Sequence, residues 1–215
     1  MTLDPDQTHP IRFPDGAVHD GTVYLNRVLE HPDILVGDYT YYSTFDPAAD
    51  PRDYAARLAP YLFAGAPEKI RIGRFCQIAH GTQFITQSAN HRMDGPSTYP
   101  FAIFDPDRIA GYRQTLDAGR DTVVGHDCWL GHGCTILPGA QLGNGVIVGA
   151  GAVVAGTVPD YAIVAGNRAQ IVRMRFAPDD IAALNRIAWW HWPIDKIVAL
   201  EDAITGGRIA DLARL

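Results

Sequence analysis

The chain has 215 residues, 47% of them hydrophobic and 20% charged, and a formal net charge of -6 at pH 7. This length suits one main domain of an ordinary globular protein. The negative balance argues against general nucleic-acid binding, which needs clustered lysine and arginine. No apolar run reaches the roughly 20 residues of a membrane-spanning helix, and the start "MTLDPDQTHP" lacks the basic and apolar parts of a signal peptide. We therefore expect a cytoplasmic protein with no nucleic-acid or membrane partner.

Residues 1–33 carry little pattern and are expected to form an N-terminal arm or cap over the open end of the fold. The next segment, "VGDYTYYSTF", begins at Val36 with an aliphatic residue followed by glycine. It places Tyr41 and Tyr42 at the start of the main domain, for which we predict the bounds 34–166. Aromatic side chains suit a bulky, partly apolar ligand, so both tyrosines are candidate substrate contacts.

A six-residue repeat dominates the centre of the chain. From Val124 the sequence divides into "VGHDCW LGHGCT ILPGAQ LGNGVI VGAGAV VAGTVP", and "IGRFCQ IAHGTQ FITQSA" shows the same pattern from Ile72. Each unit from Val124 opens with an aliphatic residue and has a small or apolar residue in its fifth position. Such regular repetition is typical of solenoid proteins.

Six residues are enough for a short strand and a tight corner, so three units close one triangular coil of about eighteen residues. Coils then stack at the sheet spacing of ~4.8 Å. Residues eighteen positions apart should therefore lie above one another on successive coils. This spacing predicts one such column formed by Val124, Leu142 and the chain at Asp160. The predicted fold class is mainly β: a parallel β-helix of hexapeptide repeats with a long inserted loop and C-terminal helices.

All three cysteines occupy the fifth position of a repeat: Cys76, Cys128 and Cys134. A small interior side chain is wanted there, and a buried thiol without a basic neighbour is inert. We therefore interpret them as reduced core residues rather than nucleophiles or disulfide partners.

The repeat stops after Ala89 and resumes at Val124, which defines an inserted loop over residues 90–123. Long loops within regular solenoids are usually functional. The segment "NHRMDGPSTYPF" is rich in turn formers, and its aromatic residues Tyr99, Phe101 and Phe104 are expected to hold the loop against the coil. Tyr99 and Phe101 are further candidate substrate contacts.

His91 lies at the root of this loop, above the last regular strand. An imidazole titrates near neutral pH and can therefore accept or donate a proton in a reaction. His91 is therefore the candidate catalytic residue.

After Gly166 the six-residue rhythm ends, and residues 167–215 form a predicted C-terminal helical segment. Arg168, Arg173 and Arg175 form a tight basic cluster in an otherwise acidic chain where the repeats end, which leaves a local anion site possible. Two helices are expected, one opened by Pro178 and one by Pro193. The tryptophans between them are interpreted as anchors of the helices on the coil: Trp189, Trp190 and Trp192.

Several segments in order resemble the xenobiotic acetyltransferases, the hexapeptide-repeat streptogramin and chloramphenicol acetyltransferases: "ANHRMDG", "STYPF", "TVVGHDCWLGHGCTILPGAQLGNG", "YAIVAGNRAQIVRMRF" and "WWHWPIDKI". The resemblance covers most of the chain, from about Ile34 to Ile197. It implies a left-handed coil, a homotrimer, acetyl-CoA as the donor without a metal, an active site between two subunits, and His91 as general base.

By the same resemblance, the donor arm passes Trp129, His132 and Ala150, while Ala155 and Gly156 keep the wall of the groove low. Arg168 and Arg173 are then the cations for the phosphates of coenzyme A. Arg168 stands where members of this family usually carry proline, and Gln170 where a basic residue is common.

Three alternatives remain open from the sequence. The same fold and chemistry would serve an acetyltransferase acting on a sugar, an amino acid such as serine, or a biosynthetic metabolite. His80, His126 and His132 share one repeat position, which would allow a metal-dependent hydratase, although six-residue spacing puts His126 and His132 on different faces. A non-catalytic scaffold is the third alternative.

Overall fold

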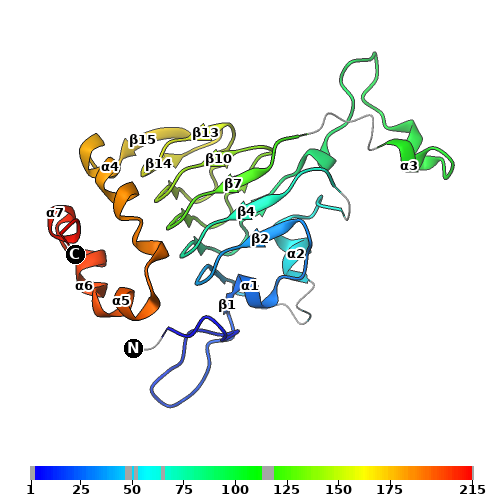
Figure 1. The fold of residues 1–215 in the computed structure, drawn as a ribbon. Helices are drawn as coiled ribbons and strands as arrows, with labels where there is room; N and C mark the ends of the chain where they lie inside the picture. Colours follow the sequence, from blue (N-terminus) through cyan, green and yellow to red (C-terminus); the bar gives the residue numbers. More distant parts are fainter. Residues whose placement is uncertain (1–2, 47–49, 51–52, 64–65, 113–118, 215) are drawn as a thin grey trace.

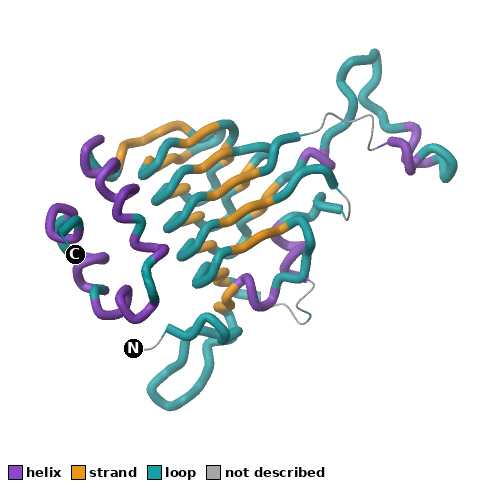
Figure 2. Tube along the Cα trace, viewed as in Figure 1, coloured by secondary structure: helices purple, strands orange, loops and turns teal. Residues whose placement is uncertain are grey.

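The computed structural model describes residues 3–46, 50, 53–63, 66–112 and 119–214. Its centre is a three-sided stack of short strands, with an N-terminal arm at one end and a row of helices along one side (Figures 1 and 2). Nearly all strand pairs are parallel; the exceptions are β1 with β3 and β14 with β15. The architecture is therefore a parallel β-helix-like coil.

Each side of the coil is one sheet. The seven-stranded sheet has the order β1 (Thr22–Tyr24), β3 (Tyr41–Ser43), β5 (Gln77–Ile78), β8 (Trp129–Leu130), β11 (Ile147–Val148), β14 (Ala162–Ala165) and β15 (Gln170–Met174). The five-stranded sheet has the order β13 (Thr157–Val158), β10 (Gln141–Leu142), β7 (Thr122–Val124), β4 (Ile70–Ile72) and β2 (Ile34–Val36). The three-stranded sheet has the order β12 (Val153–Val154), β9 (Thr135–Ile136) and β6 (Gln83–Phe84).

The chain turns at three corners in every coil, and these corners position the site. The first corner leads from the five-stranded to the seven-stranded sheet (for example 125–128). The second corner leads from the seven-stranded to the three-stranded sheet (for example 131–134), and the third corner leads back to the five-stranded sheet (for example 137–140). In a three-sided coil, the third corner lies opposite the seven-stranded sheet.

The first and fifth positions of each repeat face the core, as the sequence predicts. The opening aliphatic residues and the fifth-position residues of the units from Val124 are almost fully buried, and both sets belong to one continuous core. The aliphatic residue ends each strand instead of starting it, because an inward side chain must precede the corner. Thr122 and Val123, assigned to the inserted loop from the sequence, therefore belong to β7.

The predicted column is correct for two coils and wrong for the third. Val124 lies beside Leu142, but the next residue in this column is Val158 and not Asp160. The last coil is two residues shorter because the chain turns at Ala155 and Gly156 directly after β12. Gly156 has φ 72°, a conformation that glycine adopts without strain, and this allows the tight turn.

The cysteines are core residues, as the repeat predicts. Cys76, Cys128 and Cys134 are free thiols with no exposed surface. Burial raises the pKa of Cys134, and the pKa of Cys128 is raised by its contact with Cys76 and by burial. Cys128 and Cys134 therefore favour the unreactive thiol form.

This burial makes a direct prediction for thiol chemistry. In the native protein, we expect Ellman's reagent to label well under about one cysteine per chain within minutes, because all three thiols are buried in the core. After unfolding in guanidinium chloride, all three cysteines should react. Fast labelling of the native chain would contradict a packed core.

Helices surround the coil at its two ends and along one side. In chain order the helical segments are α1 (Leu25–Val28), α2 (Asp53–Leu58), the 3-10 helices η1 (Gln87–Ala89) and η2 (Phe101–Phe104), α3 (Ile109–Tyr112), α4 (Pro178–Ile187), the 3-10 helix η4 (Trp189–His191), α5 (Ile194–Ala199), α6 (Glu201–Gly206) and α7 (Ile209–Leu212). The helix expected from Pro193 is thus divided at Leu200, whose backbone leaves the helical conformation. Among the described residues, no helix is long and apolar enough to cross a membrane.

Candidate active site

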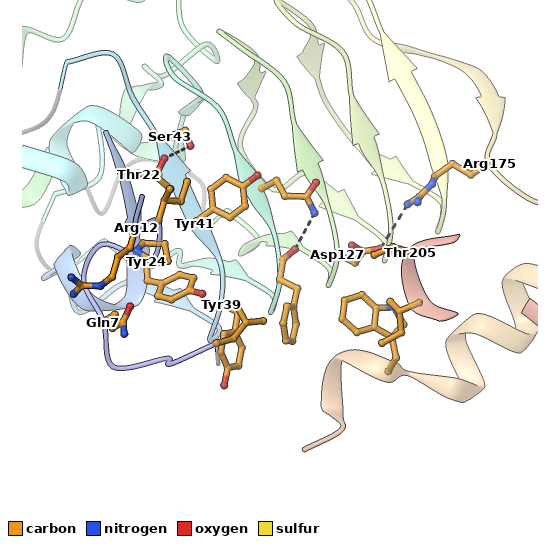
Figure 3. A pocket seen from close by; sticks show the side chains of 17 residues that line it. Gln7, Arg12, Thr22, Tyr24, Tyr39, Tyr41, Ser43, Asp127, Arg175 and Thr205 are labelled. Carbon is orange, nitrogen blue, oxygen red and sulfur yellow. Dashed lines mark hydrogen bonds and ion pairs between the residues drawn. The ribbon is translucent and has the colours of Figure 1, made fainter. Parts of the chain in front are cut away.

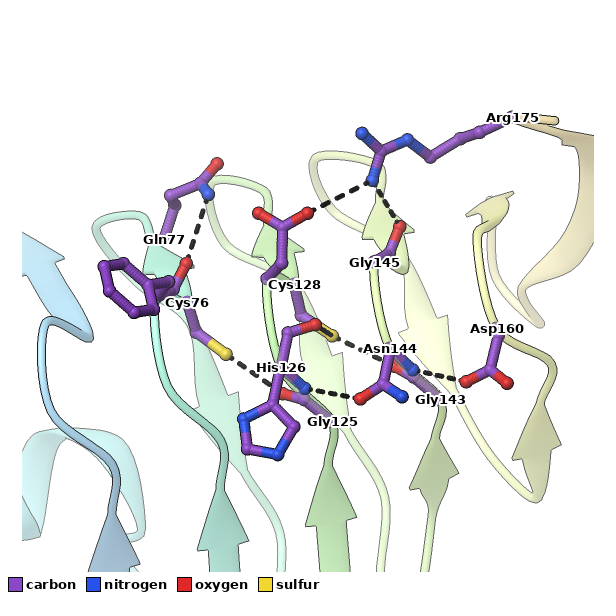
Figure 4. Close-up of polar contacts among 12 residues, drawn as sticks. Cys76, Gln77, Gly125, His126, Cys128, Gly143, Asn144, Gly145, Asp160 and Arg175 are labelled. Atoms are coloured by element: carbon purple, nitrogen blue, oxygen red, sulfur yellow. Dashed lines mark hydrogen bonds and ion pairs between the residues drawn. The ribbon is translucent and has the colours of Figure 1, made fainter. Parts of the chain in front are cut away.

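Polar contacts link successive coils at the first corner (Figure 4), and a further contact reaches the C-terminal helix α4. The Asn144 side chain accepts a hydrogen bond from the His126 backbone at 2.9 Å, and Asn144 N–H donates to Asp160 at 2.6 Å. Asn185 of α4 donates to Asp160 at 2.8 Å. Trp190 is buried and stacks on the His126 ring at 5.3 Å. The interpretation of Trp190 as an anchor of the helices is therefore confirmed.

A cavity of about 950 Å³ opens where the N-terminal arm, the seven-stranded sheet and the C-terminal helices meet (Figure 3). Thr22, Tyr41 and Ser43 line one side of it, and Asp127 and Arg175 line another. Burial raises the pKa of Tyr41, so its hydroxyl stays protonated and can donate a hydrogen bond. The cavity combines aromatic walls with a few polar groups, as small-molecule sites do.

The cavity also contains an ion pair that has no signature in the sequence. Arg175 donates to the carbonyl of Gly145 at 2.7 Å and lies 3.8 Å from the Asp127 carboxylate. Burial raises the pKa of Asp127 to about 6, against the opposing effect of Arg175. The two residues lie far apart in sequence and meet only because the chain after β15 returns to the first corner, so no local pattern could have revealed the pair.

The half-buried His126 ring predicts a pH-dependent stability. Burial, and then the charges of His191 and Arg74, lower the pKa of His126 from 6.5 to about 4 in the folded chain. The folded chain therefore favours the neutral ring. The stability that the neutral ring contributes is complete above pH 6.5 and is lost as the pH falls through 4. Asp127 acts in the opposite direction, because its pKa is raised from 3.8 to about 6.

The contribution of His126 can be isolated with His126→Asn, which does not titrate and still offers an acceptor to the Arg74 backbone N–H that now bonds the ring. We expect the wild-type advantage in free energy of unfolding over this variant to shrink by on the order of 2 kcal/mol between pH 7 and pH 4, after discounting for the partly exposed ring. Urea unfolding of both proteins at the two pH values measures this. A difference that does not change with pH would contradict the assignment.

The two tyrosines of β3 have different environments. Tyr41 faces the cavity, whereas Tyr42 is only 3% exposed and packs edge-on against Tyr54 in the core. Alternation along the strand causes the difference, since successive side chains point to opposite faces. The prediction of Tyr42 as a substrate contact is therefore corrected, and Tyr41 stays a candidate.

The residues expected along the donor arm lie at and beside the second corner. Trp129 projects from the outer surface of β8 and is 51% exposed. His132 and Ala150 occupy the second corner in consecutive coils, where Gly151 N–H donates to the His132 carbonyl at 2.8 Å. A Cβ added at Gly151 would meet no atom within 4 Å, so the wall beside Ala150 is open. This edge has room for a slender chain.

Ala155, Gly156 and His91 belong to a different edge. Ala155 and Gly156 form a turn at the third corner, and the segment that carries His91 leaves the coil after β6 at this same corner. A shallow cavity there is lined by Gln87, next to the loop root, and by Gly156. Within one chain, the predicted residues therefore divide between the second and third corners.

The His91 ring has a defined orientation. Its Nδ1 lies 3.0 Å from the backbone carbonyl oxygen of Thr98. A carbonyl oxygen only accepts hydrogen bonds, so Nδ1 carries the proton in the neutral ring and Nε2 holds a free lone pair. The turn before His91 is fixed by the buried Glu68 carboxylate, which accepts hydrogen bonds from the Ser88 backbone and hydroxyl.

The loop aromatics do not pack on the coil of their own chain. The segment with η2 and α3 stands away from the coil (Figure 1), and Tyr99 and Phe101 are 55% and 64% exposed. Tyr99 instead packs against Phe101 and stacks on Phe104. The expectation that these rings hold the loop against the coil is therefore wrong for the single chain.

The basic residues after Gly166 divide as well. Arg168 and Arg173 are exposed at the end of the coil. Arg168 lies in the connection between β14 and β15, and Arg173 lies on β15. Arg175 points instead to Asp127 and Gly145, and its guanidinium lies over the Tyr161 ring. Only Arg168 and Arg173 therefore stay candidates for phosphate contacts.

The three histidines of the hydratase alternative are not brought together. His80 and His132 stack at the second corner with ring centroids 5.5 Å apart, while His126 packs on Trp190 at the first corner. In the described part of the chain, no three His, Cys, Asp or Glu side chains gather in an arrangement that could hold a metal ion.

Comparisons with known proteins agree with the repeat architecture. A family model described as bacterial transferase hexapeptide (six repeats) matches residues 121–156. A chloramphenicol acetyltransferase of Agrobacterium fabrum is 37% identical over 195 residues, covering 89% of this chain and 91% of the relative. A virginiamycin A acetyltransferase of Staphylococcus aureus is 38% identical over 217 residues, covering 98% and 92%.

Among solved structures, a serine acetyltransferase in complex with CoA matches with a TM-score of 0.37 at 20% identity, over 66% of this chain and 40% of its own. The chain thus spans about two fifths of that structure. The two antibiotic acetyltransferases, in contrast, match along nearly their whole length. The chain therefore belongs to the hexapeptide-repeat xenobiotic acetyltransferases.

Proposed function

We propose that this protein transfers an acetyl group from acetyl-CoA to a hydroxyl of a bulky antibiotic of the chloramphenicol or streptogramin A type, with His91 as the general base. Two relatives named for acetylation of chloramphenicol and virginiamycin A support the acceptor class. The observation that carries the mechanism is the Nδ1–H bond of His91 to the Thr98 carbonyl, because it leaves Nε2 ready to accept a proton.

His91 performs both proton transfers in this proposal. Nε2 accepts the proton of the acceptor hydroxyl as its oxygen forms a bond to the acetyl carbon, and the same proton passes to the coenzyme A sulfur when the carbon–sulfur bond breaks. The Thr98 carbonyl stabilises the imidazolium between these steps, since it keeps its bond to Nδ1–H as the ring becomes positive. No protein nucleophile is required, consistent with three buried thiols.

The donor fits the open second corner. Ala150 and Gly151 leave the wall of this corner low, beside the projecting Trp129 and His132. Arg168 and Arg173 supply positive charge at the C-terminal end of the coil. We assign the pantetheine arm to this edge and the phosphates to the two arginines. The acceptor is assigned to the 950 Å³ cavity and its rim, where Tyr41 offers an aromatic wall and a hydroxyl donor.

The division of the site between two edges supports a homotrimer. His91 leaves the corner opposite the sheet that carries Tyr41 and Trp129, so one chain alone does not bring them together. A second copy would complete the site, with the loop of one chain and its exposed Tyr99 and Phe101 facing the second corner of the next. By the same family resemblance, we assign the left-handed sense to the coil.

A subunit-complementation experiment tests the shared site. Ala150→Trp blocks the donor edge of its own chain, and His91→Ala removes the base, so each homo-oligomer should be inactive. When equal amounts are co-unfolded and refolded together, about a quarter of the sites in random trimers would combine an intact edge with an intact His91. Recovery of about that fraction of wild-type turnover supports the proposal. No recovery in demonstrably mixed trimers would show that both residues act within one chain.

A further inference from the structure

The second corner carries a histidine that the proposed mechanism has not used. The His80 ring stacks on His132 with an interplanar angle of 24°, and Phe45 lies over it at 5.4 Å. The two histidines occupy the same position in successive coils, where Gly133 N–H donates to the His80 carbonyl at 2.9 Å. His80 is therefore the next side chain along the edge formed by Ala150 and His132.

The hydrogen bonds of His80 define its tautomer. The backbone N–H of Phe45 points to Nδ1 at 3.4 Å, and the Thr44 hydroxyl lies 2.9 Å from the same atom. Because a backbone N–H only donates, Nδ1 acts as the acceptor and the proton of the neutral ring is on Nε2. Among the residues that the structure describes, Nε2 has no hydrogen-bond partner. His80 therefore presents an unused N–H donor.

The ring is held firmly in this orientation. Thr44 is 5% exposed, and its backbone N–H donates to the Gly21 carbonyl at 2.7 Å. Its hydroxyl also bonds the backbone of Asp46. The support for Nδ1 is thus a buried threonine fixed on both sides, and a donor held in place before the reaction is the arrangement that stabilises developing charge most effectively.

The position of His80 along the coil points to the reacting end of the donor. This step depends on the proposed function, in which Arg168 and Arg173 hold the phosphates at the C-terminal end. The donor then runs past Ala150 and His132 toward the N-terminal coils, and the acetyl group arrives near His80. Ser43 and Tyr41, which line the acceptor cavity, belong to the next coil in that direction.

We propose that His80 is a second catalytic residue, whose Nε2–H donates a hydrogen bond to the carbonyl oxygen of the acetyl group. When the acceptor oxygen bonds to the acetyl carbon, the electron pair of the carbonyl double bond moves to this oxygen, which becomes negative. This electron pair forms the carbonyl double bond again when the carbon–sulfur bond breaks. His80 keeps its proton throughout, and His91 of the neighbouring chain carries the proton that is transferred.

Two substitutions separate this role from simple packing of the ring. His80→Phe keeps an aromatic ring to stack on His132 but has no N–H, whereas His80→Gln places an amide N–H close to the position of Nε2. We expect His80→Phe to lower kcat roughly 100-fold with little change in the KM for acetyl-CoA. His80→Gln should stay within about tenfold of wild type. If the ring only packs, His80→Phe would be the milder change, and that order would overturn the proposal.

Infrared spectroscopy provides a readout that needs no acceptor and no turnover. Acetyl-CoA labelled with ¹³C at the thioester carbonyl is bound to each variant, and the carbonyl stretch is compared with that of the free compound. We expect a shift to lower frequency in wild type and His80→Gln that disappears in His80→Phe. Equal shifts in wild type and His80→Phe would contradict the hydrogen bond. A different result would contradict the proposed function itself: wild type that binds acetyl-CoA but acetylates no acceptor.

Discussion

Replacing His91 by alanine is expected to lower kcat by roughly two to four orders of magnitude while acetyl-CoA still binds. The variant removes the Nε2 lone pair that the Thr98 contact orients for proton transfer, and it leaves the second corner and its open wall unchanged. Because the ring is exposed in the single chain, its loss leaves no core cavity. The folded state should therefore be retained, and the effect should fall on turnover.

Steady-state kinetics together with calorimetric binding of acetyl-CoA measure both parts of this prediction. His31→Ala is a suitable control, since it removes a histidine on the arm before β2, where the ring accepts a hydrogen bond from the Asp33 backbone. The control should keep wild-type turnover. If His91→Ala retained turnover within about threefold of wild type, a base at this position would be excluded and the mechanism with it.

Gly125→Ala is expected to lower the free energy of unfolding by about 3 kcal/mol or more, the largest effect on stability that we predict. A Cβ at this position would lie 2.6 Å from the backbone carbon and oxygen of Gly143 in the next coil. Both contacts are with backbone atoms that are fixed by strand pairing, so no flexible side chain can move aside. The coils would have to separate, weakening the 2.9 Å bond from Gly125 N–H to the Leu142 carbonyl.

Thermal unfolding followed by circular dichroism tests this, with Gly206→Ala as the matched control. A Cβ at Gly206, near the end of α6, would meet no atom within 4 Å. We expect the midpoint temperature to fall by about 10 °C for Gly125→Ala and to change by no more than about 2 °C for Gly206→Ala. Equal midpoints for the two variants would show that the first corner tolerates side chains and that the stacking is looser than described.

The repeat carried most of the fold prediction because its spacing is a direct consequence of strand length and corner length. Val124 and Leu142 lie side by side as the eighteen-residue arithmetic requires. The arithmetic failed at Val158, where a two-residue turn at Ala155 and Gly156 replaces a longer corner. A period shows which residues point inward, but a shortened corner is decided by local backbone conformation.

The environments of individual aromatic residues were less predictable. Tyr41 and Tyr42 are neighbours with the same side chain. They differ because side chains alternate along β3, so that one faces the cavity and the other the core. Tyr99 and Phe101 were expected on the coil, yet they are exposed in the single chain. Sequence indicates that an aromatic side chain needs a partner but does not show whether the partner belongs to the same chain.

The candidate site was partly visible in the sequence. His91 could be singled out because it stands where the repeat breaks, and the structure adds the Thr98 contact that fixes its tautomer. The pairing of Asp127 with Arg175 and the support of His80 by Thr44 join residues that lie far apart in the sequence. Contacts of this kind depend on how the coils stack, so they cannot be predicted from a short sequence motif.

Release of free thiol from acetyl-CoA, measured with Ellman's reagent, tests the central claim most directly. The purified protein is assayed with chloramphenicol, a group A streptogramin and a panel of sugars and amino alcohols, with buried protein thiols contributing little signal. We predict release that depends on one of the antibiotics and an acetylated product detected by mass spectrometry. Release only with a sugar or amino alcohol would contradict the acceptor class, and no release with any acceptor, despite measurable binding of acetyl-CoA, would contradict the proposed reaction with these compounds.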